Sequence, residues 1–141
     1  MILVKSTSQS ESGTMPSEKS LQEMTKFNEE LVKAGILLAG EGLHPTSRGV
    51  RMHIAPDGKR TLIDGPFSET KELLAGFWMI QVKSREEALA WMRRIPDPYE
   101  GQGGSVELRQ VFDAADFDYA PDIVDRENKM RAEIERQQQT K

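Results

Sequence analysis

The segment GFWMIQVK at residues 76–83 constrains the fold most, because it combines strand-forming residues with apolar side chains on both faces. Successive side chains of a strand point to opposite sides of the sheet. Trp78, Ile80 and Val82 therefore face one side, and Phe77 and Met79 face the other. A sheet built around this strand needs apolar cover on both sides.

The flanking pattern predicts a strand–helix–strand unit on each side of a hairpin. The helix expected at 16–34 carries an apolar stripe ended by Gly35, and a capping box of Ser84 and Glu87 starts the next helix. The expected elements are strands at 1–6, 36–43, 76–83 and 105–112, helices at 16–34 and 84–95, a loop at 7–14 and a hairpin with strands at 48–55 and 59–64. The stripe of the first helix consists of Leu21, Met24, Phe27, Leu31 and Ala34.

This order predicts an α+β fold of the ferredoxin-like split βαβ type, an antiparallel sheet with two helices on one face and an inserted β-hairpin. The second face of the sheet then has no cover within the chain. Since cyclic dimers dominate among small oligomers, a second copy is the simplest cover. We expect a homodimer packed sheet to sheet.

The expected domain spans residues 1–112, and residues 113–141 form a charged C-terminal extension. An irregular link at 113–122 leads to a helical segment with an apolar stripe of only Ile123, Met130 and Ile134. Two interpretations remain open for this segment: a surface helix, or a helix that clasps the partner subunit.

The composition excludes several classes of protein. With 141 residues and a net charge of −4, the chain is of single-domain size and lacks the positive surface that nucleic acids require. Because it has no cysteine, it forms neither disulfides nor thiolate sites. It shows no signal-peptide core and no membrane-spanning run, so we expect a cytoplasmic protein that does not bind membranes.

No cofactor and no metal ion are expected. The glycines at 101, 103 and 104 precede a strand rather than a helix, which does not fit a phosphate-binding loop. Glu41 and His44 are three residues apart and lack further nearby ligands, too few for a metal site.

Asp64 is the main candidate for chemistry, because it ends a hairpin strand directly before Gly65 and Pro66. In one interpretation its carboxylate accepts backbone N–H bonds of the turn and Phe67 plugs the edge of the core. In the other, it is an acid–base group at the mouth of a cavity. His44, at a strand end, is a weaker catalytic candidate.

The last core strand supplies candidates for ligand binding. If Val106 and Leu108 meet the helices, Glu107 and Arg109 face the other side, toward the expected cavity. The alternative is an ion pair at the dimer interface or the sheet edge. Further candidates for contact with a ligand are Glu41, Phe77 and Met79.

Several segments resemble the DGPF, or YCII-related, family over about residues 1–112. They are GEGL at 40–43, DGPFSETKE at 64–72, Gly76-Phe77, EEALAWMRRIP at 86–96 and VELRQV at 106–111. The resemblance implies a dimeric α/β barrel of ferredoxin-like domains and a site built on an aspartate and a histidine.

The aspartate of that site corresponds to Asp64, but the histidine on the first helix falls near Met24, which cannot transfer a proton. Either Asp64 then works with His44 or another polar group, or the chain binds without catalysis.

Three hypotheses for function follow. The first is a small-molecule site between sheet and elbow, with Asp64 as acid–base and Arg109 orienting an anionic group. The second is a non-catalytic dimeric regulatory or protein-interaction module. In the third, DGPF is purely a folding elbow.

Overall fold

A computed structural model describes residues 1–117 and 120–139, apart from the side chain of Thr70. Parts of the expected link and of the expected C-terminal helix, at 118–119 and 140–141, lie outside the described residues. The chain forms two compact units, Met1–Arg109 and Gln110–Lys141.

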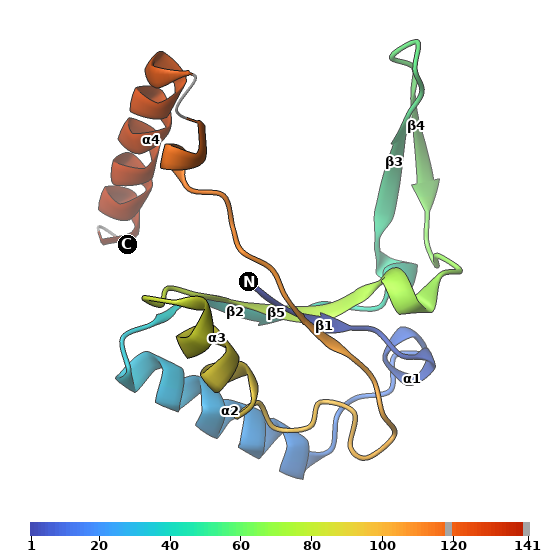
Figure 1. Cartoon of the computed structure of the whole chain (residues 1–141). Helices are drawn as coiled ribbons and strands as arrows, with labels where there is room; N and C mark the ends of the chain where they lie inside the picture. Colours follow the sequence, from blue (N-terminus) through green and yellow to red (C-terminus); the bar gives the residue numbers. More distant parts are fainter. Residues whose placement is uncertain (118–119, 140–141) are drawn as a thin grey trace. The chain divides into compact units, whose positions relative to one another are not determined.

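A four-stranded antiparallel sheet forms the centre of the first unit (Figure 1). Its order is β2-β5-β1-β6, and every neighbouring pair is antiparallel. The expected α+β class is confirmed, and this strand order is compatible with a ferredoxin-like arrangement. The bounds are Ile2–Lys5 for β1, Leu37–Gly42 for β2, Leu74–Ile80 for β5 and Val106–Leu108 for β6.

Two helices, α2 (Glu18–Lys33) and α3 (Arg85–Met92), lie on the same side of this sheet (Figure 1). Phe27 and Leu31 of α2 are buried against Ile2, Val4 and Trp78 of the sheet, and Trp91 and Met92 of α3 pack onto the same core. Trp78, Ile80 and Val82 pack on this core, so their expected grouping on one face is confirmed.

Trp78 is a core residue. Its ring meets that of Phe27 edge to face, with 5.7 Å between the ring centroids. The indole Nε1 donates a hydrogen bond of 2.7 Å to Asn28 Oδ1, which satisfies its only polar group.

The first turn of α2 differs from the expectation. Ser17 is the N-cap and accepts a hydrogen bond from the Ser20 backbone N–H, so the helix begins after Pro16 rather than at it. Ser20 is buried, whereas Leu21 is 48% exposed. Including Leu21 in the buried stripe was therefore wrong, and so was including Ala34, which is exposed at the end of the helix. The buried face of α2 starts one residue earlier than expected, at Ser20.

The capping box expected for α3 forms only in half. Ser84 Oγ accepts from the Glu87 N–H at 3.1 Å. The Glu87 carboxylate, however, accepts from the N–H of Lys83, at 2.8 Å, instead of that of Ser84. The cap still satisfies two donors at the helix start.

Three further segments depart from the expected elements. The strand expected at 76–83 is β5, which extends over Leu74–Ile80 and leaves residues 81–83 outside it. The expected loop at 7–14 contains a short helix, α1 (Ser8–Glu11), which Thr7 caps. Strand β6 is shorter than expected, and each of its three residues, Val106–Leu108, pairs with β1. Beyond it, Arg109 still exchanges hydrogen bonds with Met1.

The expected hairpin consists of β3 (Val50–Ile54) and β4 (Arg60–Asp64), which pair with each other in a separate two-stranded sheet. Asp57 Oδ1 accepts from the Lys59 N–H in the turn, and Gly58 has a φ of +83°. Every residue of both strands is exposed.

The second unit contains a 3-10 helix, η3 (Ala114–Phe117), and the helix α4 (Pro121–Gln139). The expected C-terminal helix is confirmed over its described residues, and none of its described residues is buried. None of the helices within the described ranges has the length and apolar character needed to cross a membrane.

Candidate functional site

The segment after Asp64 forms an elbow held by residues far away in the sequence. Gly65 N–H donates to the Gly49 carbonyl at 3.0 Å, and Phe67 N–H donates to Thr46 Oγ1 at 3.0 Å. Thr46 belongs to the 3-10 helix η1 (Thr46–Arg48) and in turn donates through Oγ1 to Glu11 Oε2 at 2.6 Å. The elbow is therefore tied to η1 and, through Glu11, to α1.

Gly65 is required by the closeness of this contact. A Cβ atom at position 65 would lie 1.7 Å from the Thr46 carbonyl oxygen, a backbone atom that cannot turn away. Phe67 is partly buried, and the Arg51 guanidinium stacks over its ring at 3.9 Å from the centroid. The glycine of DGPF is thus explained by packing.

The Asp64 carboxylate does not hold this turn. Asp64 is exposed at the end of β4, and no described residue donates a hydrogen bond to its side chain. The backbone N–H groups of Gly65 and Phe67 instead find Gly49 and Thr46. The carboxylate remains available to solvent or to another molecule.

His44 lies close to the elbow in sequence but has a different contact. Its Nε2 atom lies 3.0 Å from an Arg48 guanidinium nitrogen, and both side chains are exposed. No hydrogen bond within residues 1–117 and 120–139 joins His44 to Asp64. The structure does not assemble a carboxylate–imidazole pair from these two residues.

The remaining candidates lie on the sheet face opposite the helices. Register places Glu41 beside Phe77, Phe77 beside Leu3, and Leu3 beside Glu107, a row that crosses all four strands. Met79, two residues after Phe77 on β5, lies on the same face and is paired with Ala39 of β2. Acidic groups thus flank an apolar centre on this face.

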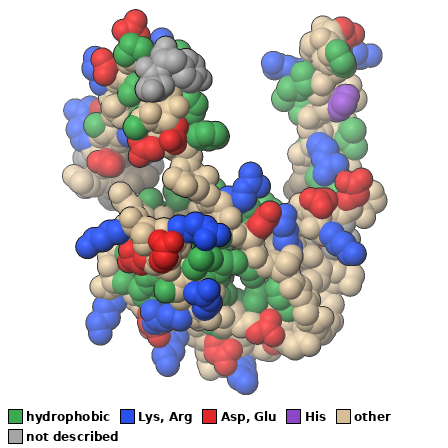
Figure 2. All heavy atoms as spheres, viewed as in Figure 1, with side chains coloured by type: hydrophobic (Ala, Val, Ile, Leu, Met, Phe, Trp, Pro, Cys, Tyr) green, Lys and Arg blue, Asp and Glu red, His purple; other side chains and the backbone are tan. Residues whose placement is uncertain are grey.

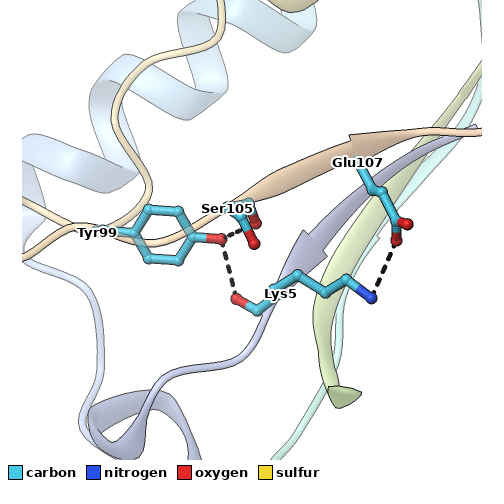
Figure 3. Close-up of polar contacts among 4 residues, drawn as sticks. All are labelled: Lys5, Tyr99, Ser105 and Glu107. Carbon is cyan, nitrogen blue, oxygen red and sulfur yellow. Dashed lines mark hydrogen bonds and ion pairs between the residues drawn. The ribbon is translucent and has the colours of Figure 1, made fainter. Parts of the chain in front are cut away.

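Glu107 is ion-paired with Lys5 across β6 and β1, at 3.0 Å (Figure 3). This hydrogen bond and the charge of Lys5, with a smaller contribution from Arg109, hold the pKa of Glu107 below its usual value. The expectation that Glu107 and Arg109 lie opposite the helix-facing Val106 and Leu108 agrees with the packing of those two residues on the core.

A cavity of about 430 Å³ opens where β1 leaves the sheet. At this point the Lys5 N–H donates to the Ser105 carbonyl, and the Ser6 N–H donates to the Leu73 carbonyl. The cavity therefore lies between the end of the sheet, the elbow and the loop before β6. Its lining consists of Lys5, Ser6, Thr7, Ser8, Lys71, Gly104 and Ser105.

Tyr99 fixes the loop that forms one side of this cavity. Its hydroxyl lies 3.0 Å from the Lys5 carbonyl and 2.5 Å from the Ser105 carbonyl, and donates between them (Figure 3). Partial burial raises the pKa of Tyr99, so the phenol keeps its proton. A Cβ on Gly104 would lie 2.4 Å from the Tyr99 ring, so glycine is needed there.

The lining residues of the cavity offer cations and hydroxyl groups but no carboxylate or imidazole, and the exposed lining is largely apolar. Lys5 comes from the sheet and Lys71 from the 3-10 helix η2 (Thr70–Glu72) of the elbow. None of the side chains singled out from the sequence lines it: Asp64, His44, Arg109, Glu107, Glu41, Phe77 and Met79. Sequence reasoning overlooked Lys71 although it stands within DGPFSETKE, and Ser105 gave no signal.

Metal ligands are not clustered in the described part of the chain: it contains no group of three or more His, Cys, Asp or Glu side chains that could hold an ion.

Comparison with known proteins matches the chain to the YCII-related domain over residues 1–115. A relative from Rhizobium meliloti (strain 1021), the uncharacterized protein R00369, is 33% identical over 94 residues, which cover 67% of this chain and 74% of the relative. The family resemblance of the DGPF and GEGL segments is confirmed, and the chain belongs to the family of YCII-related domains.

Proposed function

We propose that this chain binds a small polar molecule with an anionic group in the cavity between the sheet and the DGPF elbow. The observation that carries the proposal is this open-sided surface cavity, whose volume of about 430 Å³ falls in the range of small-molecule sites. Lys5 and Lys71 supply positive charge, and hydroxyl groups supply hydrogen bonds.

The two lysines contribute differently. Glu107 offsets the charge of Lys5 at 3.0 Å and fixes its position. Lys71 forms no ion pair with a described residue, so its charge is free to meet an anion. Lys71 is therefore the residue whose removal should weaken binding most, and added salt should weaken binding as well.

The active form in this proposal is a homodimer, with the sheet face that carries Leu3, Phe77 and Met79 packed against its copy to form a dimeric α/β barrel. The support is that these side chains are only partly buried in the single chain. Joining the faces would remove apolar surface from water at about 25 cal/mol per Å².

Catalysis by Asp64 is a separate part of the proposal. Asp64 does not line the cavity of its own chain, so an acid–base role requires a substrate bound outside this cavity, at the exposed end of β4. Arg109 and His44 are the accompanying candidates for orienting an anionic group and for proton transfer.

The test is a thermal-shift screen of phosphorylated and carboxylated metabolites. A ligand that binds only the folded chain raises Tm by mass action. We expect hits with the wild type that are lost in Lys71→Gln and retained in Lys83→Gln, a matched exposed lysine outside the cavity. Equal hits for both variants, or none with the wild type, would reject the cavity as the site.

A non-catalytic dimeric regulatory or interaction module is the second candidate function. It is favoured by the contacts of Gly65 and Phe67 with Thr46, which give the DGPF segment a purely structural purpose. In that case an Asp64→Asn variant would retain every interaction of the wild type.

A further inference from the structure

One face of the β3–β4 hairpin is apolar and exposed. Residues opposite each other in the pairing share a face, which groups Val50 with Asp64, Met52 with Leu62, and Ile54 with Arg60. The apolar members are between 47% and 71% exposed. They are Val50, Met52, Ile54 and Leu62, and together with Asp64 and Arg60 we name them the hairpin face.

The exposure of these apolar side chains is unusual for a hairpin that forms a sheet of only two strands. A two-stranded ribbon is marginally stable in water without further packing. The hairpin pairs with no strand of the four-stranded sheet, so β3 and β4 gain no support from it through strand pairing. Figure 2 shows hydrophobic side chains on the surface of the hairpin, alongside charged ones.

The charges on the hairpin face are arranged so that it complements itself. Asp64 stands at the base of the hairpin and Arg60 near its tip, both on β4. Two copies can lie face to face about a two-fold axis in two ways. With the axis along the strands, β3 covers β4 of the other copy, and Asp64 and Arg60 each meet an apolar residue.

With the axis across the strands, each strand covers its own copy in the opposite direction. Asp64 then faces Arg60 of the partner subunit twice, Val50 faces Ile54 of the partner subunit, and Met52 and Leu62 each face themselves. Only this arrangement pairs opposite charges and buries apolar residues together, as an isologous contact requires.

We propose that the hairpin face docks antiparallel on the hairpin face of a second copy of the chain, with Asp64 paired to Arg60 of the partner subunit. This contact is distinct from the sheet-to-sheet packing and from the cavity. It gives the aspartate of DGPF a partner that the single chain does not provide, and an Asp64 held in this ion pair has a structural role in place of an acid–base one.

Because the chain contains no cysteine, a single introduced cysteine is its only site for thiol crosslinking. In the full chain, Met52→Cys places a thiol in the middle of the hairpin face, and His53→Cys places one next to it on the opposite face. Facing sheets lie about 10 Å apart, which is too far for a direct disulfide, so a short bis-maleimide is the suitable reagent.

We expect Met52→Cys to give crosslinked dimer in severalfold excess over His53→Cys, which measures random collision. Equal yields, or no crosslinking of Met52→Cys, would overturn the proposal, because a hairpin that docks on another surface does not bring two copies of position 52 together.

The charge pairing is tested in the Met52→Cys background. Asp64→Lys alone should reduce crosslinking. The double variant that combines Asp64→Lys with Arg60→Asp exchanges the two charges and should restore crosslinking, and this recovery also shows that the chain still folds. Failure of the exchange to restore crosslinking, with the circular dichroism spectrum unchanged, would reject the Asp64–Arg60 contact.

Discussion

At the scale of the residue, Trp78 determines what its neighbour across the sheet can be. Gly40 is paired with Trp78, and a Cβ at position 40 would lie 2.8 Å from the indole ring. The ring cannot move aside freely, because it is bonded to Asn28 and packed on Phe27. Gly42, two residues along the same strand, faces open space.

We therefore expect Gly40→Ala to lower the free energy of unfolding by about 1–3 kcal/mol, the usual cost of overpacking. Gly42→Ala is the matched control and should leave it unchanged or raise it by up to about 1 kcal/mol. Chemical denaturation of both variants measures the difference. Equal stabilities of the two variants would contradict the contact with Trp78.

The ion pair of Lys5 and Glu107 predicts a pH dependence. The folded-state pKa of Glu107 lies below its ordinary value of 4.5, so the pair stabilises the fold above pH 4.5. This contribution is lost as the pH falls through the lowered pKa.

The difference in Tm between wild type and Glu107→Gln should thus be largest at neutral pH and vanish in acid. A thermal melt series over pH, with Glu86→Gln as an exposed control outside the pair, makes the comparison. A difference that stays constant with pH would show that Glu107 acts through its shape rather than its charge.

Single side chains could be predicted only where the cause is local. Ser84 as an N-cap follows from its own helix, and the structure confirms it. The choice between Ser20 and Leu21 for the buried face depends on how α2 rotates against the sheet, which a helical stripe defines only to about one residue.

At the scale of the element, the DGPF elbow is held by Thr46 and Glu11. The sequence placed the elbow between the hairpin and the central strand correctly. It could not supply the partners, because Thr46 and Glu11 come from other segments, and side-chain hydrogen bonds over such separations leave no periodic signal.

Thr46→Val removes the acceptor for Phe67 N–H and the donor to Glu11, and should cost about 1–3 kcal/mol of stability. Asp64→Asn, measured at a concentration where the chain is monomeric, should change stability by no more than about 0.5 kcal/mol. Denaturant titration separates the two. A larger loss of stability in Asp64→Asn would show that the Asp64 carboxylate stabilises the turn.

At the scale of the whole molecule, the strand order agrees with the alternation of strands and helices in the sequence, because short connections and antiparallel pairing leave few other arrangements. The residues that line the cavity could not be predicted from the sequence. Its walls come from the end of β1, the elbow and the loop before β6, which only the folded chain brings together.

The proposed sheet-to-sheet dimer predicts the effect of a charge on its face. Phe77→Lys should lose about 1.5–3 kcal/mol of apolar burial in each subunit. Because a two-fold interface carries the substitution twice, the dimer Kd should rise by about a hundredfold or more. Sedimentation equilibrium measures it, with Leu21→Lys on the exposed side of α2 as control. An unchanged Kd for Phe77→Lys would exclude this face from the interface.

The most direct test of the central claim is an amide NMR titration of the full chain with the anionic compound that raises Tm most in the screen. The cavity predicts shift changes concentrated at residues 5–8, at Lys71 and at residues 104–105, and weakened in Lys71→Gln. Changes concentrated at Asp64 and along the hairpin instead, or spread without focus, would contradict binding in this cavity.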